Sequence, residues 1–285
     1  DIIFPGIPKT FRKNHITDPL RAVFISDLHI GSNEYLPKVE ERFLKWVNGT
    51  SKDASEIKYI CIAGDVVDGV GIYPDQKDDL KIKNIFDQYN TFETFIEKIP
   101  DHIQIVICPG NHDAVRQAEP QPPFDSHYFP TISKFRNVHL VQNPCSLSLH
   151  SFDNNPGINV LMYHGYSFTS LNNAVPDLRK HGISNPKFLL KELIRKRHLA
   201  PLFGSTIITP KSSDDLVINS IPDILHTGDL HGFCIDSYEN KIDLFSTSTF
   251  QGQTSFMDRV GHTANPGKVI HENLMTRQIG YETFY

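Results

Sequence analysis

The sequence predicts an α/β fold built as a layered α/β/α sandwich. Short apolar runs rich in β-branched residues indicate buried strands, and longer stretches between them repeat apolar residues every three or four positions, as helices do. The strands are expected at 22–25, 59–62, 105–108, 160–162 and 221–225, and the main helices at 38–47 and about 79–98. Alternation of strands and helices along a chain is typical of layered α/β folds.

The remaining elements are expected to be shorter. Strands are predicted at 146–149 and 242–245, and helices near 170–181 and at 186–198, where Pro186 occupies a permitted first position. The second of these helices ends in a basic run, which either contacts phosphates or faces solvent and complements the helix C-terminus. The segment 204–215 has the composition of a surface loop and could border a cleft.

Side chains that can bind metals follow the five predicted main strands directly. They occur in Asp27-Leu28-His29, Gly64-Asp65-Val66-Val67-Asp68, Gly110-Asn111-His112-Asp113, His164 and Gly228-Asp229-Leu230-His231. Because ligands of open α/β sheets collect outside the carboxyl ends of the strands, we expect these side chains at one edge. Their oxygen and imidazole groups suit two divalent metal ions. Any single motif could instead be a turn or cap, since Asp, Asn and Gly favour turns. Five motifs in register argue against that alternative.

The residue types fit a two-metal phosphoesterase centre. Two cations about 3.5–4 Å apart can hold a phosphate oxygen, activate the attacking water and steady the leaving oxygen. Asp65 is central in the motif order and is the expected bridging carboxylate. Asn111 supplies a neutral oxygen, which limits the negative charge facing an anionic phosphate. His112 is expected to protonate the departing oxygen or stabilise the transition state, with Asp113 orienting its ring.

Length and composition agree with one enzyme domain. A chain of 285 residues lies within the range of single α/β domains with insertions, and a formal charge of −5 gives no overall attraction to nucleic acid. No apolar stretch approaches the roughly 20 residues that span a bilayer, and no signal peptide is recognisable. The cysteines, Cys61, Cys108, Cys145 and Cys234, form no C-x-x-C pair and are expected to be reduced thiols. We therefore expect a soluble intracellular protein.

The five motifs resemble those of the calcineurin-like metallophosphoesterase superfamily, which read D-x-H, G-D-x-x-D, G-N-H-D/E, H and G-H-x-H. The resemblance implies a four-layered α/β/β/α sandwich with two mixed sheets flanked by helices. It also implies a first metal site of Asp27, His29, Asp65 and His231, a second of Asp65, Asn111 and His164, and His112 as the catalytic histidine. Asp229 departs from the pattern, because it stands where the family has a histidine. As a ligand it would favour harder metals at the second site, and it places a further negative charge beside the substrate phosphate.

Longer signatures narrow the resemblance. The segments 24–32, 64–74, 163–167, 197–201 and 248–256 are similar to the small subunit of the archaeal D-family DNA polymerase, and the likeness extends over residues 4–266. This implies a 3′–5′ exonuclease that proofreads for a separate large polymerase subunit, acts on DNA 3′ ends and uses two divalent ions. Mn²⁺ is the usual ion, with Mg²⁺, Fe²⁺ and Zn²⁺ as alternatives. It also implies a cytoplasmic, nucleoid-associated archaeal protein.

The same resemblance suggests a domain plan. Residues 1–20 are expected to be a linker from an N-terminal OB-fold domain absent here, 21–270 the phosphoesterase domain, and 271–285 a C-terminal tail. Two other functions stay open. The first is a non-catalytic scaffold subunit of a polymerase, with Asp229 marking the loss of activity, and the second is a free phosphodiesterase acting on small molecules.

Overall fold

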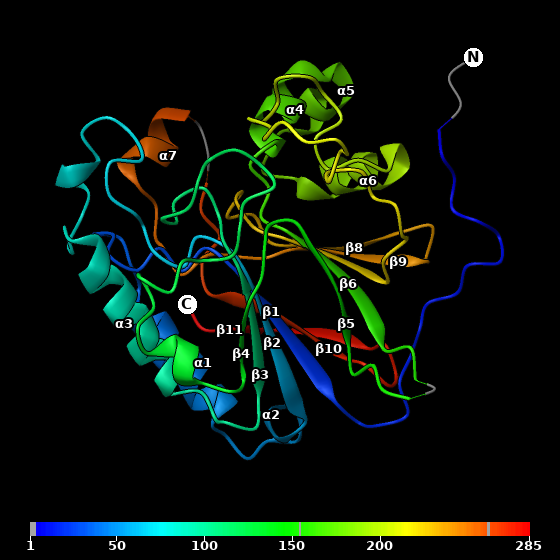
Figure 1. The fold of residues 1–285 in the computed structure, drawn as a ribbon, viewed down its shortest axis with the longest axis horizontal. Coiled ribbons are helices and arrows are strands. Elements are labelled where there is room, and N and C mark those ends of the chain that lie inside the picture. The colour runs from blue at the N-terminus through cyan, green and yellow to red at the C-terminus, as the bar shows by residue number, and fades with distance from the viewer. Residues whose placement is uncertain (1–3, 154, 261–262) are drawn as a thin grey trace.

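Two sheets pack face to face in the computed structural model, and helices cover both outer faces (Figure 1). The structure describes residues 4–153, 155–260 and 263–285. The first sheet has the strand order β11-β10-β1-β2-β3-β4. Its strands are β1 (Arg21–Ile25), β2 (Ile57–Ala63), β3 (Gln104–Cys108), β4 (Val138–Leu140), β10 (Lys268–Asn273) and β11 (Ile279–Thr283). Strands β1 to β4 run parallel, whereas β10 and β11 add antiparallel neighbours at the β1 side, so the sheet is mixed.

The second sheet is mixed as well, with the strand order β5-β6-β7-β9-β8. Its strands are β5 (Cys145–Leu149), β6 (Ile158–Tyr163), β7 (Ile224–Thr227), β8 (Cys234–Tyr238) and β9 (Ile242–Ser246). The central strands β6, β7 and β9 are parallel, and antiparallel strands close both edges.

Helices cover the outer face of each sheet. The first sheet packs against α1 (Pro37–Val47) and α3 (Ile85–Glu97), and the second against α4 (Phe168–Ala174), α5 (Pro176–His181) and α6 (Pro186–Lys196). The short helix α2 (Lys52–Ser55) precedes β2, and α7 (Ser255–Val260) follows β9. Single 3₁₀ turns lie at Gln76–Asp78 and Ile132–Lys134.

A third apolar layer lies between the two sheets. It confirms the four-layered sandwich that the family resemblance implies and corrects the α/β/α sandwich expected from the alternating elements. In β1, Val23 and Ile25 face the helices, whereas Ala22 and Phe24 face the second sheet. Because β1 is buried on both faces, its sequence is a continuous apolar run rather than an alternating one. Phe24 meets Phe245 of β9 at a ring distance of 5.1 Å, which joins the two sheets.

Several expected element boundaries differ from the structure. The helix expected at about 79–98 begins only at Ile85, where the side chain of Asn84 accepts a hydrogen bond from the N–H of Phe86 and caps the first turn. The helix expected at 170–181 is two helices, because the residue before Pro176 is extended and Pro176 starts a new one. The strand expected from residue 221 starts at Ile224.

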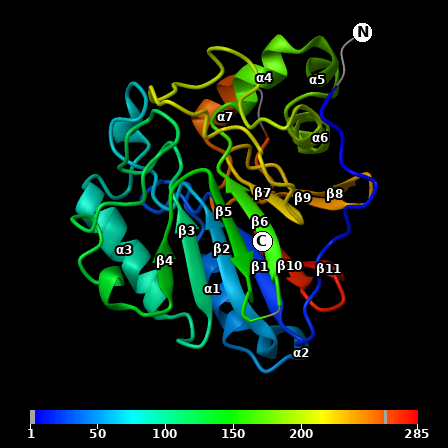
Figure 2. The same cartoon turned by 45° about the vertical axis from the view of Figure 1, so that its right-hand side comes forward.

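The first described residues and the last residues of the chain pack on the sandwich. The last fifteen residues do not form the expected tail, since 271–273 complete β10 and 279–283 form β11 at the edge of the first sheet. Residues 4–20 run beside the second sheet on their way to β1 (Figure 2). There Lys13 pairs with Asp243, the backbone N–H of Asn14 donates to Asp223 at 2.7 Å, and Ile16 is buried.

Two further expectations concern membranes and thiols. Within the described residues, no helix combines the length and apolar character needed to cross a bilayer. All four cysteines are free thiols, with Cys61 and Cys108 buried in β2 and β3 as expected.

The inter-sheet layer predicts a large stability effect at Phe245, which is fully buried. Phe245→Ala should lower the free energy of unfolding by about 3–5 kcal/mol, since it removes a ring from a packed core. Chemical denaturation monitored by circular dichroism measures this. Phe203→Ala is the matched control, because Phe203 is fully exposed, and it should change stability by less than about 0.5 kcal/mol. Equal effects for the two variants would contradict the assignment of the core.

Candidate metal centre

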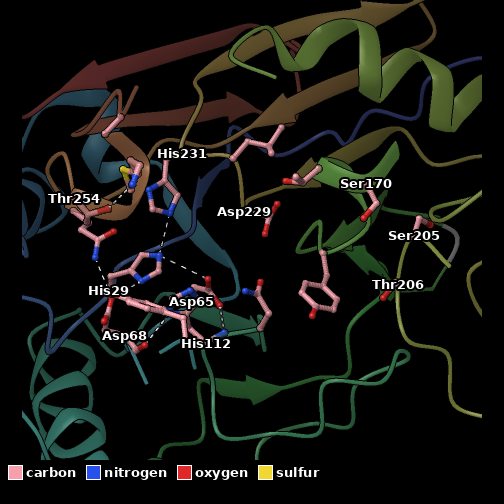
Figure 3. A pocket seen from close by; sticks show the side chains of 18 of the residues that line it. His29, Asp65, Asp68, His112, Ser170, Ser205, Thr206, Asp229, His231 and Thr254 are labelled. Atoms are coloured by element: carbon pink, nitrogen blue, oxygen red, sulfur yellow. Dashed lines mark hydrogen bonds and ion pairs between the residues drawn. The ribbon is translucent and has the colours of Figure 1, made fainter. Parts of the chain in front are cut away.

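The five motifs meet at one end of the sandwich, where β1, β2 and β3 of the first sheet and β6 and β7 of the second reach their carboxyl ends. A cavity of about 620 Å³ opens there. Figure 3 shows His29, Asp65, His112 and His231 gathered on one side of the cavity, with Asp229 facing them. All nine side chains predicted for the site lie in or directly behind this cluster.

Left-handed backbone turns aim the side chains inward. Asp27, His29 and Asp65 have φ values of 53°, 49° and 51°, and Asp229 and His231 have 68° and 52°. Each Asp-Leu-His motif thus adopts the same turn. Its Asp and His face the cavity, whereas Leu28 and Leu230 are buried in the core. Non-glycine residues rarely take this conformation, and when they do it is commonly at functional sites.

The first group of ligand atoms is formed by Asp27, His29 and His231. The Nε2 atoms of the two histidines lie 3.0 Å apart, and Nε2 of His231 lies 3.4 Å from Oδ1 of Asp27. Their ligand atoms all lie within 4.8 Å of one another, a spacing that one metal ion can fill. Asp27 and His29 are almost fully buried.

The second group shares Asp65 with the first. Oδ2 of Asp65 lies 3.3 Å from Nε2 of His164 and 3.7 Å from Nε2 of His29, so one oxygen faces both groups. Nε2 of His164 also lies 2.9 Å from Oδ1 of Asn111 and 3.9 Å from Oδ1 of Asp229. Asp65 therefore has the position expected of a bridging carboxylate.

Hydrogen bonds from the Nδ1 atoms of His29 and His164 orient the two imidazole rings so that their Nε2 atoms can bind a metal ion. Nδ1 of His29 donates to Oδ1 of Asp68 at 3.0 Å, and Nδ1 of His164 donates to the carbonyl oxygen of Ala63 at 2.7 Å. In a neutral ring this donation leaves the lone pair on Nε2, which faces the cluster. Such an oxygen acceptor behind each histidine is the usual support of a metal-binding imidazole. The residues present therefore fit a pair of divalent cations.

Two glutamines hold Asp68 in this supporting position. The side-chain amide of Gln251 donates to Oδ1 of Asp68 at 3.0 Å, and that of Gln76 donates to Oδ2 at 3.0 Å. The sequence does not predict the roles of Gln76 and Gln251, because they depend on contacts between distant parts of the chain.

His112 reaches the cavity, but Asp113 does not orient it as expected. Nδ1 of His112 donates to the backbone oxygen of Asp68 at 2.8 Å, which directs Nε2 towards the cavity. The carboxylate of Asp113 instead accepts the backbone N–H groups of Gly110 and Asp65, at 2.8 and 2.9 Å. Its side chain turns back to bind the motif loops together, so Asp113 acts on the shape of the site rather than on the histidine ring.

The cluster carries an excess of buried carboxylates. Burial alone would raise the pKa of Asp65, but the charges of His164 and His112 hold that pKa well below its usual value. Burial raises the pKa of Asp113 to about 7, and the charge of Asp65 adds to the shift. Burial also raises the pKa of Asp229 to about 7; His164 opposes this shift, whereas Asp27 and Asp65 reinforce it. Bound cations would relieve this crowding of negative charge.

The cavity is also lined by residues for which the sequence predicted no place in the site. They include Tyr73, Tyr166, Thr169, Ser170, Thr254 and Met257, and the segment 204–207 forms part of the wall. Of these, only the segment 204–207 lies in a stretch that was expected to border a cleft. No spacing in the sequence marks the others, since each comes from a loop or helix start that reaches the cavity only in the folded chain.

Comparison with known proteins agrees with the sequence signatures. The model of the family described as the B subunit of DNA polymerase alpha/epsilon matches residues 22–234. The DNA polymerase II small subunit of Methanocaldococcus jannaschii is 41% identical over 276 residues, which cover 94% of this chain and 44% of that protein. The subunits of the same name from Archaeoglobus fulgidus and Pyrococcus furiosus are each 39% identical; the matches cover 94% and 96% of this chain, and 54% and 44% of those proteins.

The chain thus spans about half the length of the curated relatives it matches. Among solved structures, Chaetomium thermophilum Vps29 aligns with 92% of this chain and 94% of its own, with 11% identity and a TM-score of 0.39. The match of the family model over most of the chain settles its membership: this chain belongs to the family of DNA polymerase alpha/epsilon B subunits.

Proposed function

We propose that this chain is the phosphoesterase part of the small subunit of an archaeal D-family DNA polymerase, and that it removes nucleotides from DNA 3′ ends. Its partner would be the separate large subunit, its setting the archaeal cytoplasm beside the nucleoid, and residues 1–20 would connect it to an OB-fold domain. The observation that carries the proposal is the shared carboxylate of Asp65, which faces imidazoles from two different sheets.

Two divalent cations, of which we favour Mn²⁺, would be held by these groups. Asp27, His29, Asp65 and His231 would bind the first, and Asp65, Asn111, His164 and Asp229 the second. When bound, such a pair supplies Lewis-acid activation of water and charge neutralisation of the phosphate. The protein supplies the fixed frame: buried carboxylates, imidazoles held by outer hydrogen bonds, and a cavity large enough for a nucleotide.

His112 is the proposed proton donor. Its Nδ1–H donates to the backbone oxygen of Asp68, so in the doubly protonated imidazolium the proton available for transfer is the one on Nε2 at the cavity. During hydrolysis the bond between phosphorus and the 3′ oxygen of the penultimate nucleotide breaks, and that oxygen takes the proton from His112. One water is consumed for each nucleoside 5′-monophosphate released.

A non-catalytic scaffold is the second candidate, and Asp229 is the observation that favours it. Its carboxylate lies 3.9 Å from Nε2 of His164, where the superfamily pattern has a histidine. A fifth carboxylate near the substrate phosphate would weaken the attraction for an anion. The other predicted ligands remain in place, however, and a site that had lost its function would be expected to lose more than one of them.

The metal proposal predicts strong stabilisation by Mn²⁺. Each ion at a free concentration of one hundred times its dissociation constant should raise the free energy of unfolding by about 2.7 kcal/mol. Gly110→Ala should abolish most of this gain, because an added Cβ would clash with Oδ1 of Asp65 and lie 2.7 Å from the His164 ring. Gly6→Ala, where nothing lies within 4 Å, is the matched control. Thermal unfolding of metal-stripped protein titrated with Mn²⁺ measures the effect, and equal gains in both variants would speak against this site.

The exonuclease proposal predicts Mn²⁺-dependent release of nucleotides from a primer with a mismatched 3′ end. His112→Ala should lower the rate by about 10²–10⁴-fold, the usual contribution of a general acid. His139→Ala, on β4 and paired with Gln104, is the control and should leave the rate unchanged.

Asp229→His separates the two candidate functions in the same assay. If the native chain is an exonuclease, this change should alter its rate only modestly, since ligation is retained. A native chain that releases no nucleotides, and gains activity through Asp229→His, would identify the scaffold instead.

A further inference from the structure

One wall of the cavity is a loop between α6 and β7, formed by residues 202–209 and here named the wall loop. Gly204, Ser205, Thr206 and Ile207 line the cavity. In Figure 3, Ser205 and Thr206 lie across the cavity from His29 and Asp68. A substrate whose phosphate reaches the carboxylate and imidazole cluster would therefore pass beside this loop.

The wall loop is held by Glu119 at its C-terminal end and by an internal turn at its start. The backbone oxygen of Ile207 accepts the N–H of Glu119 at 2.7 Å, and the N–H of Thr209 donates to the oxygen of Glu119 at 2.8 Å. Ser205 is buried, and both its backbone N–H and its hydroxyl donate to the oxygen of Leu202, at 3.0 and 2.7 Å. The loop is therefore a fixed part of the site.

Glu119, which holds the wall loop, is also connected to the candidate metal-binding cluster. The buried carboxylate of Glu119 accepts the hydroxyl of Tyr163 at 3.1 Å and the amide of Asn143 at 3.4 Å. Oδ1 of Asn143 in turn accepts the backbone N–H of His164 at 2.9 Å. One network thus positions the wall loop and a proposed ligand relative to each other.

On this fixed loop, large apolar side chains are turned to solvent. Phe203 is 102% exposed, and Ile207 and Ile208 are 57% and 44% exposed. Phe203 is the most exposed large apolar residue in the described part of the chain. Exposed large apolar side chains grouped on one loop beside a polar cavity are typical of a binding surface.

We propose that Phe203 stacks on an unpaired base next to the 3′ end, so that the site selects single-stranded or frayed DNA ends. The inference rests on the proposed function. A terminal phosphodiester carries a flat, apolar base a few bonds away, and aromatic side chains bind bases of any sequence through their faces. The cations proposed at Asp65 and its neighbours would hold the phosphate, and Phe203 would hold the base, which distinguishes an unpaired end from one buried in a duplex.

The test compares oligonucleotides that differ only in their bases. One is an oligothymidylate, and the other carries abasic residues at its last two 3′ positions. Binding is measured by fluorescence anisotropy with Mn²⁺ in a His112→Ala background, which suppresses cleavage, and KM and kcat are measured in the native background. Phe203→Ala should raise the dissociation constant and KM for oligothymidylate by at least about fivefold. It should leave the abasic strand unaffected, and Phe203→Trp should restore tight binding. Phe152→Ala is the matched control, because Phe152 is 50% exposed and lies before β6, at the opposite end from His164.

The other outcomes distinguish a failure of the stacking surface from a failure of the exonuclease proposal. An equal effect on both strands, or no effect, would show that Phe203 contacts no base, even if the native protein still releases nucleotides. Unchanged DNA binding together with loss of co-purification with the polymerase large subunit would assign the wall loop to a protein interface. If the native protein releases no nucleotides but shows base-dependent binding through Phe203, the exonuclease proposal falls and the stacking surface stands.

Discussion

The end of the sandwich is organised around the carboxylate of Asp65. One of its oxygens faces Nε2 of both His29 and His164, and the other accepts the backbone N–H of His112 at 2.8 Å. Asp65 is buried, and a buried carboxylate without compensation would be strongly unfavourable. Compensation comes from three different motifs, which follow β1, β3 and β6. The buried charge of Asp65 is therefore stabilised by groups from both sheets, which must end beside each other. The proposed chemistry also needs groups from both sheets at this place.

The backbone around Asp65 is shaped to allow this convergence. Gly110 approaches so closely that a Cβ there would lie 2.6 Å from the backbone nitrogen of Asp65, and Asp113 ties the two loops together through their N–H groups. The left-handed turns at the Asp-Leu-His motifs are each unfavourable by about 1–3 kcal/mol per residue. They persist because Leu28 and Leu230 are buried in the apolar layers beneath. Core packing thus stabilises the strained turns.

The parts of the fold that sequence predicted are those buried on both faces. β1, β2 and β3 have continuous apolar runs in sequence. The apolar stripes of α1 and α3 pack against one face of the sheet that these strands form. β8 and β11 are edge strands with half-buried, polar-interrupted sequences, so no run of apolar residues marks them. β10 carries only Val269 and Ile270 as aliphatic residues and is buried by its pairing with β1.

The candidate site was predictable where its residues are close together in the chain, and less so where they are not. Motifs such as Asp27-Leu28-His29 place two candidate ligands on one turn, which spacing can reveal. Gln251 reaches Asp68 across 183 positions, and Glu119 acts through Asn143 on His164, so only the folded chain shows them. Asp113 shows the opposite failure. It is the sequence neighbour of His112, yet its side chain turns away to the backbone of Asp65.

Asp229 is the one position that departs from the superfamily pattern, and its backbone and its side chain have different roles. Its backbone N–H donates to both carboxylate oxygens of Asp27, at 3.1 and 3.2 Å, which stabilises a proposed ligand of the first ion. Any residue other than proline provides that N–H. Its φ of 68° is a conformation in which Asn, Asp and His are all enriched among non-glycine residues. The turn can therefore accept either residue without rearrangement. What changes between Asp and His at this position is the charge that the side chain can place beside His164, while the backbone turn stays the same.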